Sequence, residues 1–159
     1  MENKLIINND DYVFKLVCKD KNKPTETTVF GDENNRLEVN VYNGSYQISS
    51  MECIYLDNIV VDKYYLPDYT QINGIKEFHD ISCYYEEDSF RDFELNLNNN
   101  NQLDILLNEN LDPTHYYVDG RIEYYYDDNM LLLYVKIKDL TPEEYNYFKN
   151  IHSSLNITK

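Results

Sequence analysis

The fold is decided first by residues 36–49, which read RLEVNVYNGSYQIS. The leucine and the two valines of this stretch alternate with polar side chains, which is the period of a strand with one buried face. Asn43-Gly44 follows, a dipeptide suited to the positive φ angles of a tight hairpin turn. A strand-like pattern resumes after the glycine, so the sequence predicts a β-hairpin.

The same signals recur further along the chain. Asp119-Gly120 is a second turn dipeptide, and it predicts a hairpin over residues 116–126. Residues 130–138 are apolar and β-branched enough for a central strand. Residues 1–97 and 115–138 together supply seven to nine predicted strands.

The clearest predicted helix is at the C-terminal end. Thr141 suits the N-cap, Pro142 the first helical position, and Glu144 completes a capping box. The apolar stripe that follows has helical spacing: Tyr145, Phe148, Ile151, His152 and Leu155. This helix is expected to lie across a sheet face.

A second, short helix is predicted from about Gln102 to Asn110, because Leu103, Leu106 and Leu107 share one side of a helix. The predicted fold class is therefore α+β. It is a mainly antiparallel sheet with a C-terminal helix and one short internal helix, in a single acidic globular domain over residues 1–159. The alternative is a β-sandwich with a capping helix.

Net charge is the most informative part of the composition. The 159 residues carry a formal charge of −15, and residues 57–128 hold 17 acids against four bases. This field disfavours direct binding to nucleic acid or to anionic membranes, and it attracts a basic partner. A solubility surface is the competing interpretation.

No motif points to catalysis or to a bound cofactor. The four glycines exclude a phosphate-binding loop and a dinucleotide fingerprint. Cys18, Cys53 and Cys83 have no paired spacing and are interpreted as small core residues. We therefore expect no enzyme activity, no catalytic residue, no metal and no cofactor. A small enzyme with dispersed residues and a weak divalent-ion site at Glu86-Glu87-Asp88 are the minor alternatives.

Tyrosine is concentrated where the acids are. Ten of the 17 tyrosines fall within residues 57–128, several of them beside carboxylates, and tyrosine is common at binding hot spots. In the second hairpin, alternation places Tyr117, Ile122, Tyr124 and Tyr126 inward and Tyr116, Glu123, Tyr125 and Asp127 on an outer face. The competing interpretation is that tyrosine replaces phenylalanine under an AT-rich coding bias. The predicted partner-binding residues are Tyr84, Tyr85, Glu86, Glu87, Asp88, Tyr116, Glu123, Tyr125, Asp127 and Asp128.

These observations favour a non-enzymatic acidic inhibitor whose carboxylates stand in for phosphates on a basic partner, such as a nuclease or another nucleic-acid-binding protein. Phage anti-defence inhibitors of the anti-CRISPR type and toxin immunity proteins have this character. The alternative function is a structural or assembly protein of a virion or scaffold. The apolar run at Leu5–Ile7 is too short for a secretory signal, so we expect a cytoplasmic protein, in the host cell if a phage encodes it.

Overall fold

The computed structural model describes residues 4–17, 25–42, 48–57, 59–66, 72–75, 92–129 and 131–157. These residues form twelve strands in two sheets and one C-terminal helix. In these broad terms the predicted α+β class is confirmed, but the strand count exceeds the predicted seven to nine. Among the described residues, no helix combines the length and the apolar character needed to cross a membrane.

The smaller sheet has five strands in the order β1-β2-β5-β4-β3, with all neighbours antiparallel. β4 and β5 form the hairpin that the opening sequence pattern predicts, and the side chains of Leu37, Val39 and Val41 are buried. The turn residues 43–47 lie outside the described residues. The strands are β1 (Lys4–Ile6), β2 (Phe14–Val17), β3 (Thr25–Gly31), β4 (Arg36–Tyr42) and β5 (Ile48–Tyr55).

The larger sheet has seven strands in the order β6-β8-β9-β12-β11-β10-β7. The five central strands pair with one another in antiparallel fashion, whereas β6 and β7 are two-residue strands that pair in parallel at the two edges. The strands are β6 (Val60–Val61), β7 (Asn73–Gly74), β8 (Glu94–Asn98), β9 (Gln102–Leu106), β10 (His115–Asp119), β11 (Ile122–Tyr126) and β12 (Leu132–Ile137).

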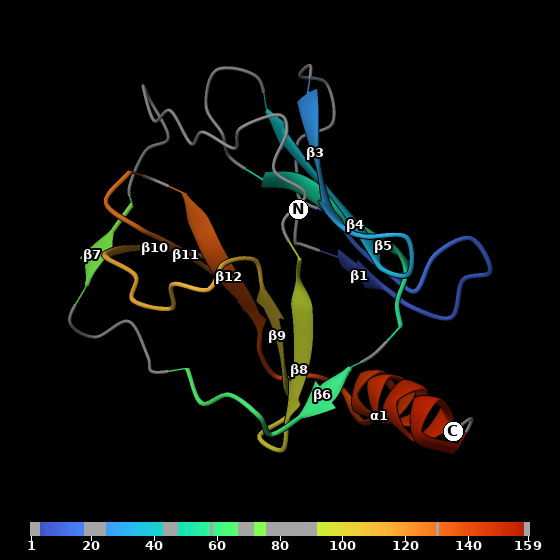
Figure 1. Cartoon of the computed structure of the whole chain (residues 1–159). Helices are drawn as coiled ribbons and strands as arrows, with labels where there is room; N and C mark the ends of the chain where they lie inside the picture. Colours follow the sequence, from blue (N-terminus) through green and yellow to red (C-terminus); the bar gives the residue numbers. More distant parts are fainter. Residues whose placement is uncertain are drawn as a thin grey trace.

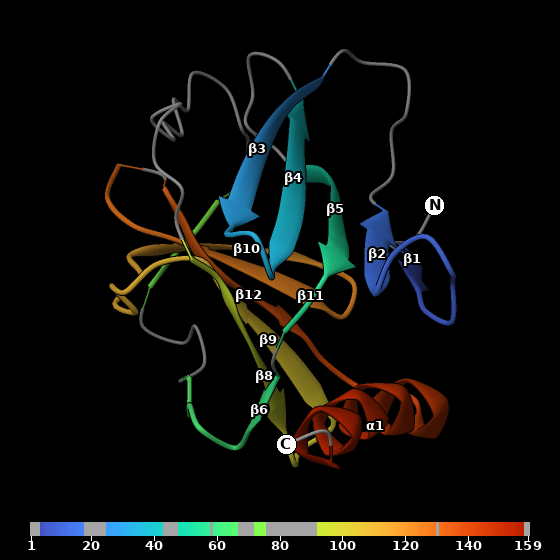
Figure 2. The ribbon, with the colours of Figure 1, turned by 45° about the vertical axis from the view of Figure 1, so that its right-hand side comes forward.

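The two sheets share one hydrophobic core. A single cluster of buried side chains takes members from β2 to β5, from β8, β9, β11 and β12, and from the helix α1 (Pro142–Ile157). Figures 1 and 2 show the smaller sheet over one face of the larger sheet, with α1 at one end of the molecule. This arrangement of layers is close to the alternative prediction of two stacked sheets with a helix.

The predicted capping box of α1 is present. The Glu144 backbone N–H donates to Thr141 Oγ1 at 3.1 Å, and the Thr141 N–H donates to Glu144 Oε1 at 2.9 Å. Further along the helix, Phe148 is fully buried and its ring meets Phe14 of β2 edge-on, with centroids 5.9 Å apart. The helix therefore begins where its local sequence dictates and is held by the core.

Arg121, at the turn between β10 and β11, fixes the start of α1. Its two terminal guanidinium nitrogens each donate to a Glu144 carboxylate oxygen at 2.7 Å. Burial alone would raise the pKa of Glu144, but the hydrogen bonds and charge of Arg121, together with the bonds to Thr141, bring that pKa below its ordinary value.

The predicted internal helix from Gln102 to Asn110 is wrong. Residues 102–106 form strand β9, which pairs with β8 across a three-residue turn at Asn99–Asn101. Asn101 has a φ of 60°, the left-handed conformation expected of the last residue in such a loop. The turn forces the chain back along β8, and the leucines then alternate between the two faces of the sheet.

Candidate functional site

The strand order brings six carboxylates to one end of the larger sheet. Because the central strands are antiparallel, the start of β8, the end of β9, the start of β12, the end of β11 and the start of β10 all lie at this end. The acids at or next to these strand ends, which we call the acidic end, are Asp92, Glu94, Glu109, Asp112, Asp127 and Asp128.

Short side-chain turns shape the loops that carry these acids. The Asn110 N–H donates to Asn108 Oδ1 at 2.9 Å, and the Asp112 N–H donates to Asn110 Oδ1 at 3.0 Å. In the next loop Asp127 Oδ1 accepts the N–H groups of Asn129 and Leu131, both at 2.9 Å. The asparagines and aspartates of this region thus stabilise the loop conformations by hydrogen bonding, and the aspartates also give the loops negative charge.

Most of the acidic end is open to solvent. Asp92, Glu109, Asp112 and Asp128 are exposed, whereas Glu94 and Asp127 are half-buried. Within the described part of the chain, one ion pair involves these six residues: Lys63 Nζ lies 3.0 Å from Glu94 Oε1. The described part of the chain therefore supplies one ion-paired cation for these six carboxylates.

The opposite end of the same sheet is different, because its cations are paired. Arg121 binds Glu144, and Lys138 Nζ lies 3.3 Å from Glu123 Oε2. Residues 92–128 contain nine acids and one base, Arg121, and that base lies away from the acidic end. At the opposite end each of these two cations thus faces a carboxylate, whereas four of the six acids at the acidic end are exposed.

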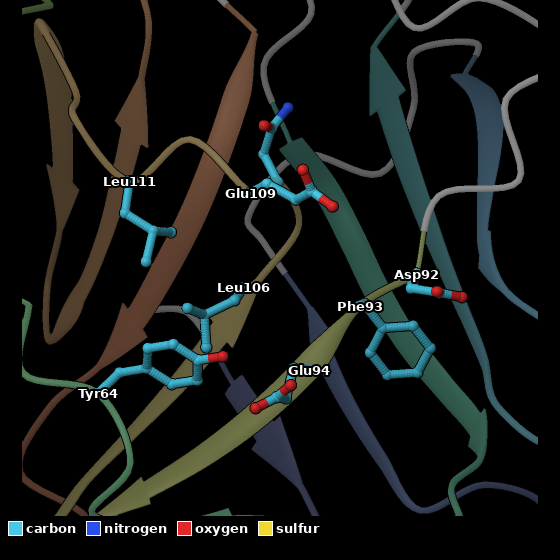
Figure 3. Close-up of a pocket in the computed structure, with 8 residues that line it drawn as sticks. Tyr64, Asp92, Phe93, Glu94, Leu106, Glu109 and Leu111 are labelled. Carbon is cyan, nitrogen blue, oxygen red and sulfur yellow. The ribbon is translucent and has the colours of Figure 1, made fainter.

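The acidic end contains a pocket of about 330 Å³ (Figure 3). Figure 3 shows Tyr64, Leu106 and Leu111 on one side of it, Phe93 and Asp92 on the other, and Glu94 and Glu109 between them. Within the described residues, no group of three or more carboxylate, histidine or cysteine side chains is arranged to hold a metal ion. The pocket therefore combines an apolar wall with separated negative charges.

The structure separates the predicted partner-binding residues into three groups. Asp127 and Asp128 belong to the acidic end. Tyr116, Glu123 and Tyr125 share the outer face of the larger sheet, the face turned away from the common core. The remaining five lie outside the described residues: Tyr84, Tyr85, Glu86, Glu87 and Asp88.

The expectation that this outer face is exposed is wrong. Tyr125 is 0% exposed and Glu123 is 4% exposed, so neither side chain can contact a partner in this structure. A second hydrophobic cluster covers the face. It consists of Leu66, Leu106, Tyr125, Leu133 and Tyr134, with Tyr64, Ile72, Leu111, Tyr116 and Leu131 packed against it. The rings of Tyr125 and Tyr134 stack with centroids 4.6 Å apart, so these tyrosines act as core residues.

A row of buried polar side chains crosses the same face. In the strand register Asn96 lies opposite Asp104, Asp104 opposite Lys136, and Lys136 opposite Glu123. Asn96 donates to Asp104 Oδ2 at 2.9 Å, and Lys136 Nζ donates to the Leu66 carbonyl at 2.7 Å. These buried charges compensate one another and are not available as a binding surface.

Burial governs the ionisation of the groups on this face. It raises the pKa of Asp104, while hydrogen bonds from Asn96 and Gln102 and the charge of Lys136 oppose that rise. Burial also raises the pKa of Tyr134, whose hydroxyl has no hydrogen-bond partner among the described residues. Tyr134 thus remains a neutral phenol over the physiological range.

Cys53 has the predicted character of a small core residue. It is fully buried, and burial raises the pKa of its thiol to about 12. Because the thiolate is the reactive form, this thiol is unsuited to nucleophilic chemistry. Cys18 and Cys83 lie outside the described residues.

Four members of the acidic end were not among the predicted binding residues: Asp92, Glu94, Glu109 and Asp112. The sequence feature that could have identified them is their position, because each lies near the start or the end of a strand in the acidic stretch. Predicting that these acids lie together requires the correct strand order. The wrongly predicted helix over residues 102–110 removed one strand from that order.

No model of a protein family matches the chain, and no curated protein matches it.

Proposed function

We propose that the protein is a non-enzymatic acidic inhibitor and that the acidic end is the surface with which it blocks a basic, nucleic-acid-handling partner. The single observation that carries this proposal is the grouping of Asp92, Glu94, Glu109, Asp112, Asp127 and Asp128 at one end of the larger sheet, where among the described residues Lys63 is their one ion-paired cation. A protein that binds phosphates presents lysines and arginines, and carboxylates are attracted to the same side chains.

The dimensions of the acidic end support this use. Neighbouring strands lie about 4.8 Å apart, so the loops at β8 and β11, three strands apart, are separated by roughly 14 Å. A protein interface of ordinary size covers about 800 Å² on each partner. One interface can therefore include all six carboxylates, and their combined field would speed association with a basic surface at low salt.

The experiment compares two variants with the same net charge. The first reverses four exposed acids of the acidic end: Asp92→Lys, Glu109→Lys, Asp112→Lys and Asp128→Lys. The control reverses four exposed acids near the smaller sheet: Asp10→Lys, Asp11→Lys, Glu33→Lys and Asp57→Lys. Each reversal raises the net charge by two, so four reversals change the net charge of either variant from −15 to −7.

Each protein is used to capture its partner from an extract of the organism that makes it, and association is then measured against salt concentration. We expect a basic nucleic-acid-binding protein to bind the wild type and the control, to be released by heparin, and not to bind the acidic-end variant. Equal capture by both variants would contradict the proposal. Salt-insensitive self-association without a basic partner would instead favour the structural alternative.

A further inference from the structure

The pocket at the acidic end has a lining of mixed character. Tyr64, Leu106 and Leu111 supply the apolar wall, and Glu94 and Glu109 supply negative charge beside it. A lining of this kind excludes anionic ligands and suits a group with an apolar stem and a cationic head, which is the character of lysine and arginine side chains.

The size of the pocket also restricts its occupant. Its volume of about 330 Å³ is at the lower end of the range of about 300–1,000 Å³ typical of small-molecule sites. A single side chain fits this space better than a dinucleotide or another large cofactor. The occupant that matches both size and charge is one basic side chain of a partner protein.

The chain itself holds a cation at the edge of this pocket. Lys63 Nζ lies 3.0 Å from Glu94 Oε1 and 5.1 Å from the centroid of the Tyr64 ring. The combination of a carboxylate and an aromatic face therefore already binds an ammonium group here. Lys63 uses one oxygen of Glu94, and Glu109 has no ion-pair partner among the described residues.

We propose that this pocket receives one arginine side chain of the basic partner, with its stem against Leu106 and Leu111 and its guanidinium between Glu94 and Glu109. Arginine suits the site better than lysine, because a planar guanidinium can stack on an aromatic ring and donate to two carboxylates at once. This inference rests on the proposed function, since it names the side chain that the acidic end would recognise.

The test uses N-acetyl-arginine amide as the probe and follows the backbone amide signals of the isotope-labelled protein by NMR. Ligand efficiency for a molecule of this size sets an expected Kd of about 1 mM. We expect localised shifts at Asn108, Glu109 and Leu111, and binding at least fivefold weaker for N-acetyl-lysine amide. N-acetyl-citrulline amide, a neutral probe of the same shape, should give no localised shifts.

Glu109→Gln removes one pocket charge from an exposed position, and Glu143→Gln removes one from the exposed first turn of α1. The first variant should weaken arginine binding at least fivefold, and the second should leave it unchanged. Equal shifts with the citrulline probe, or the absence of localised shifts at about ten times the expected Kd, would overturn the inference. If capture of a basic partner still depends on the acidic end in that case, the proposed function stands and the pocket assignment alone fails.

Discussion

Replacing Lys136 by methionine tests the buried polar row on the outer face of the larger sheet. Lys136 is 1% exposed, and it lies between Asp104 and Glu123 in the strand register. Methionine keeps most of the volume of the side chain and removes the charge. The variant therefore removes the buried cation whose charge acts on Asp104, while Glu123 keeps its ion pair with Lys138, and it removes the donor to the Leu66 carbonyl.

The expected loss is a large part of the stability of the domain. Removing one partner of a buried charge pair costs about 3–5 kcal/mol, because the remaining charge is buried and uncompensated. Domains of this kind are stable by about 5–15 kcal/mol. With a urea m-value of about 2 kcal/mol per molar, a loss of about 4 kcal/mol lowers the unfolding midpoint by about 2 M.

The pH dependence gives a second, independent signature. Burial raises the pKa of Asp104 above its ordinary value of 3.8, and the charge of Lys136 opposes that rise. Without Lys136 the pKa rises further, so the folded variant takes up a proton more readily than the unfolded chain as the pH falls. The deficit relative to the wild type should therefore be largest at pH 7 and should shrink as the pH is lowered toward 4.

Urea unfolding followed by far-ultraviolet circular dichroism at pH 7 and at pH 5 measures both effects. The matched control is Lys149→Met, the same chemical change at an exposed position on α1, which should change stability by less than about 0.5 kcal/mol. An unchanged midpoint for Lys136→Met at pH 7, or a deficit that grows as the pH falls, would refute the interpretation of this row as a compensated charge network.

Three further predictions concern the attachment of the helix and one turn. Phe148→Ala should lower the unfolding free energy by about 3–5 kcal/mol in calorimetry, because it empties a fully buried site; a loss below about 1 kcal/mol would contradict this packing. Arg121→Met should cost about 1–3 kcal/mol at pH 7. The lowered pKa of Glu144 stabilises the wild type above about pH 4.5, so the difference between the two proteins should close as the pH falls below that value, and a difference that persists at pH 2 would contradict it. Gly31→Ala should destabilise strongly in urea unfolding, because Gly31 has a φ of 115° and an added Cβ would lie 2.0 Å from the Asn35 carbonyl oxygen; a wild-type midpoint would argue against this turn.

Features encoded by neighbouring residues could be predicted from the sequence. The capping box at Thr141 and Glu144 lies within four residues, and the β4–β5 hairpin needs only alternation and a turn dipeptide. In both cases the residues that determine the structure lie next to one another in the sequence. No information from distant parts of the chain is needed to predict it.

The error at residues 102–110 has a different origin. Leu103, Leu106 and Leu107 match a helical stripe, whereas Leu103, Ile105 and Leu107 match a strand equally well. All three members of the second set are buried in the common core. The turn at Asn99–Asn101 decides between the two patterns, and a run of asparagines resembles low-complexity sequence more than a defined turn.

The candidate site was the hardest part to predict. Alternation correctly placed Tyr125 and Glu123 on the outer face, but it carries no information about what covers that face. Part of the cover comes from Leu66, about sixty residues earlier in the chain. The excess of acids could be counted in the sequence, whereas their meeting at one end of a sheet depends on strand order.

The two short parallel strands have a consequence for assembly. β6 and β7 cap opposite edges of the larger sheet, and both come from the single stretch of chain between Val60 and Gly74. Each covers part of its neighbour: β7 pairs with His115 and Tyr116 of β10, and β6 pairs with Asn96 and Leu97 of β8. Among the described residues, these two strands therefore shorten the edge that a strand from a second molecule could extend, and short edge strands of this kind disfavour edge-to-edge aggregation.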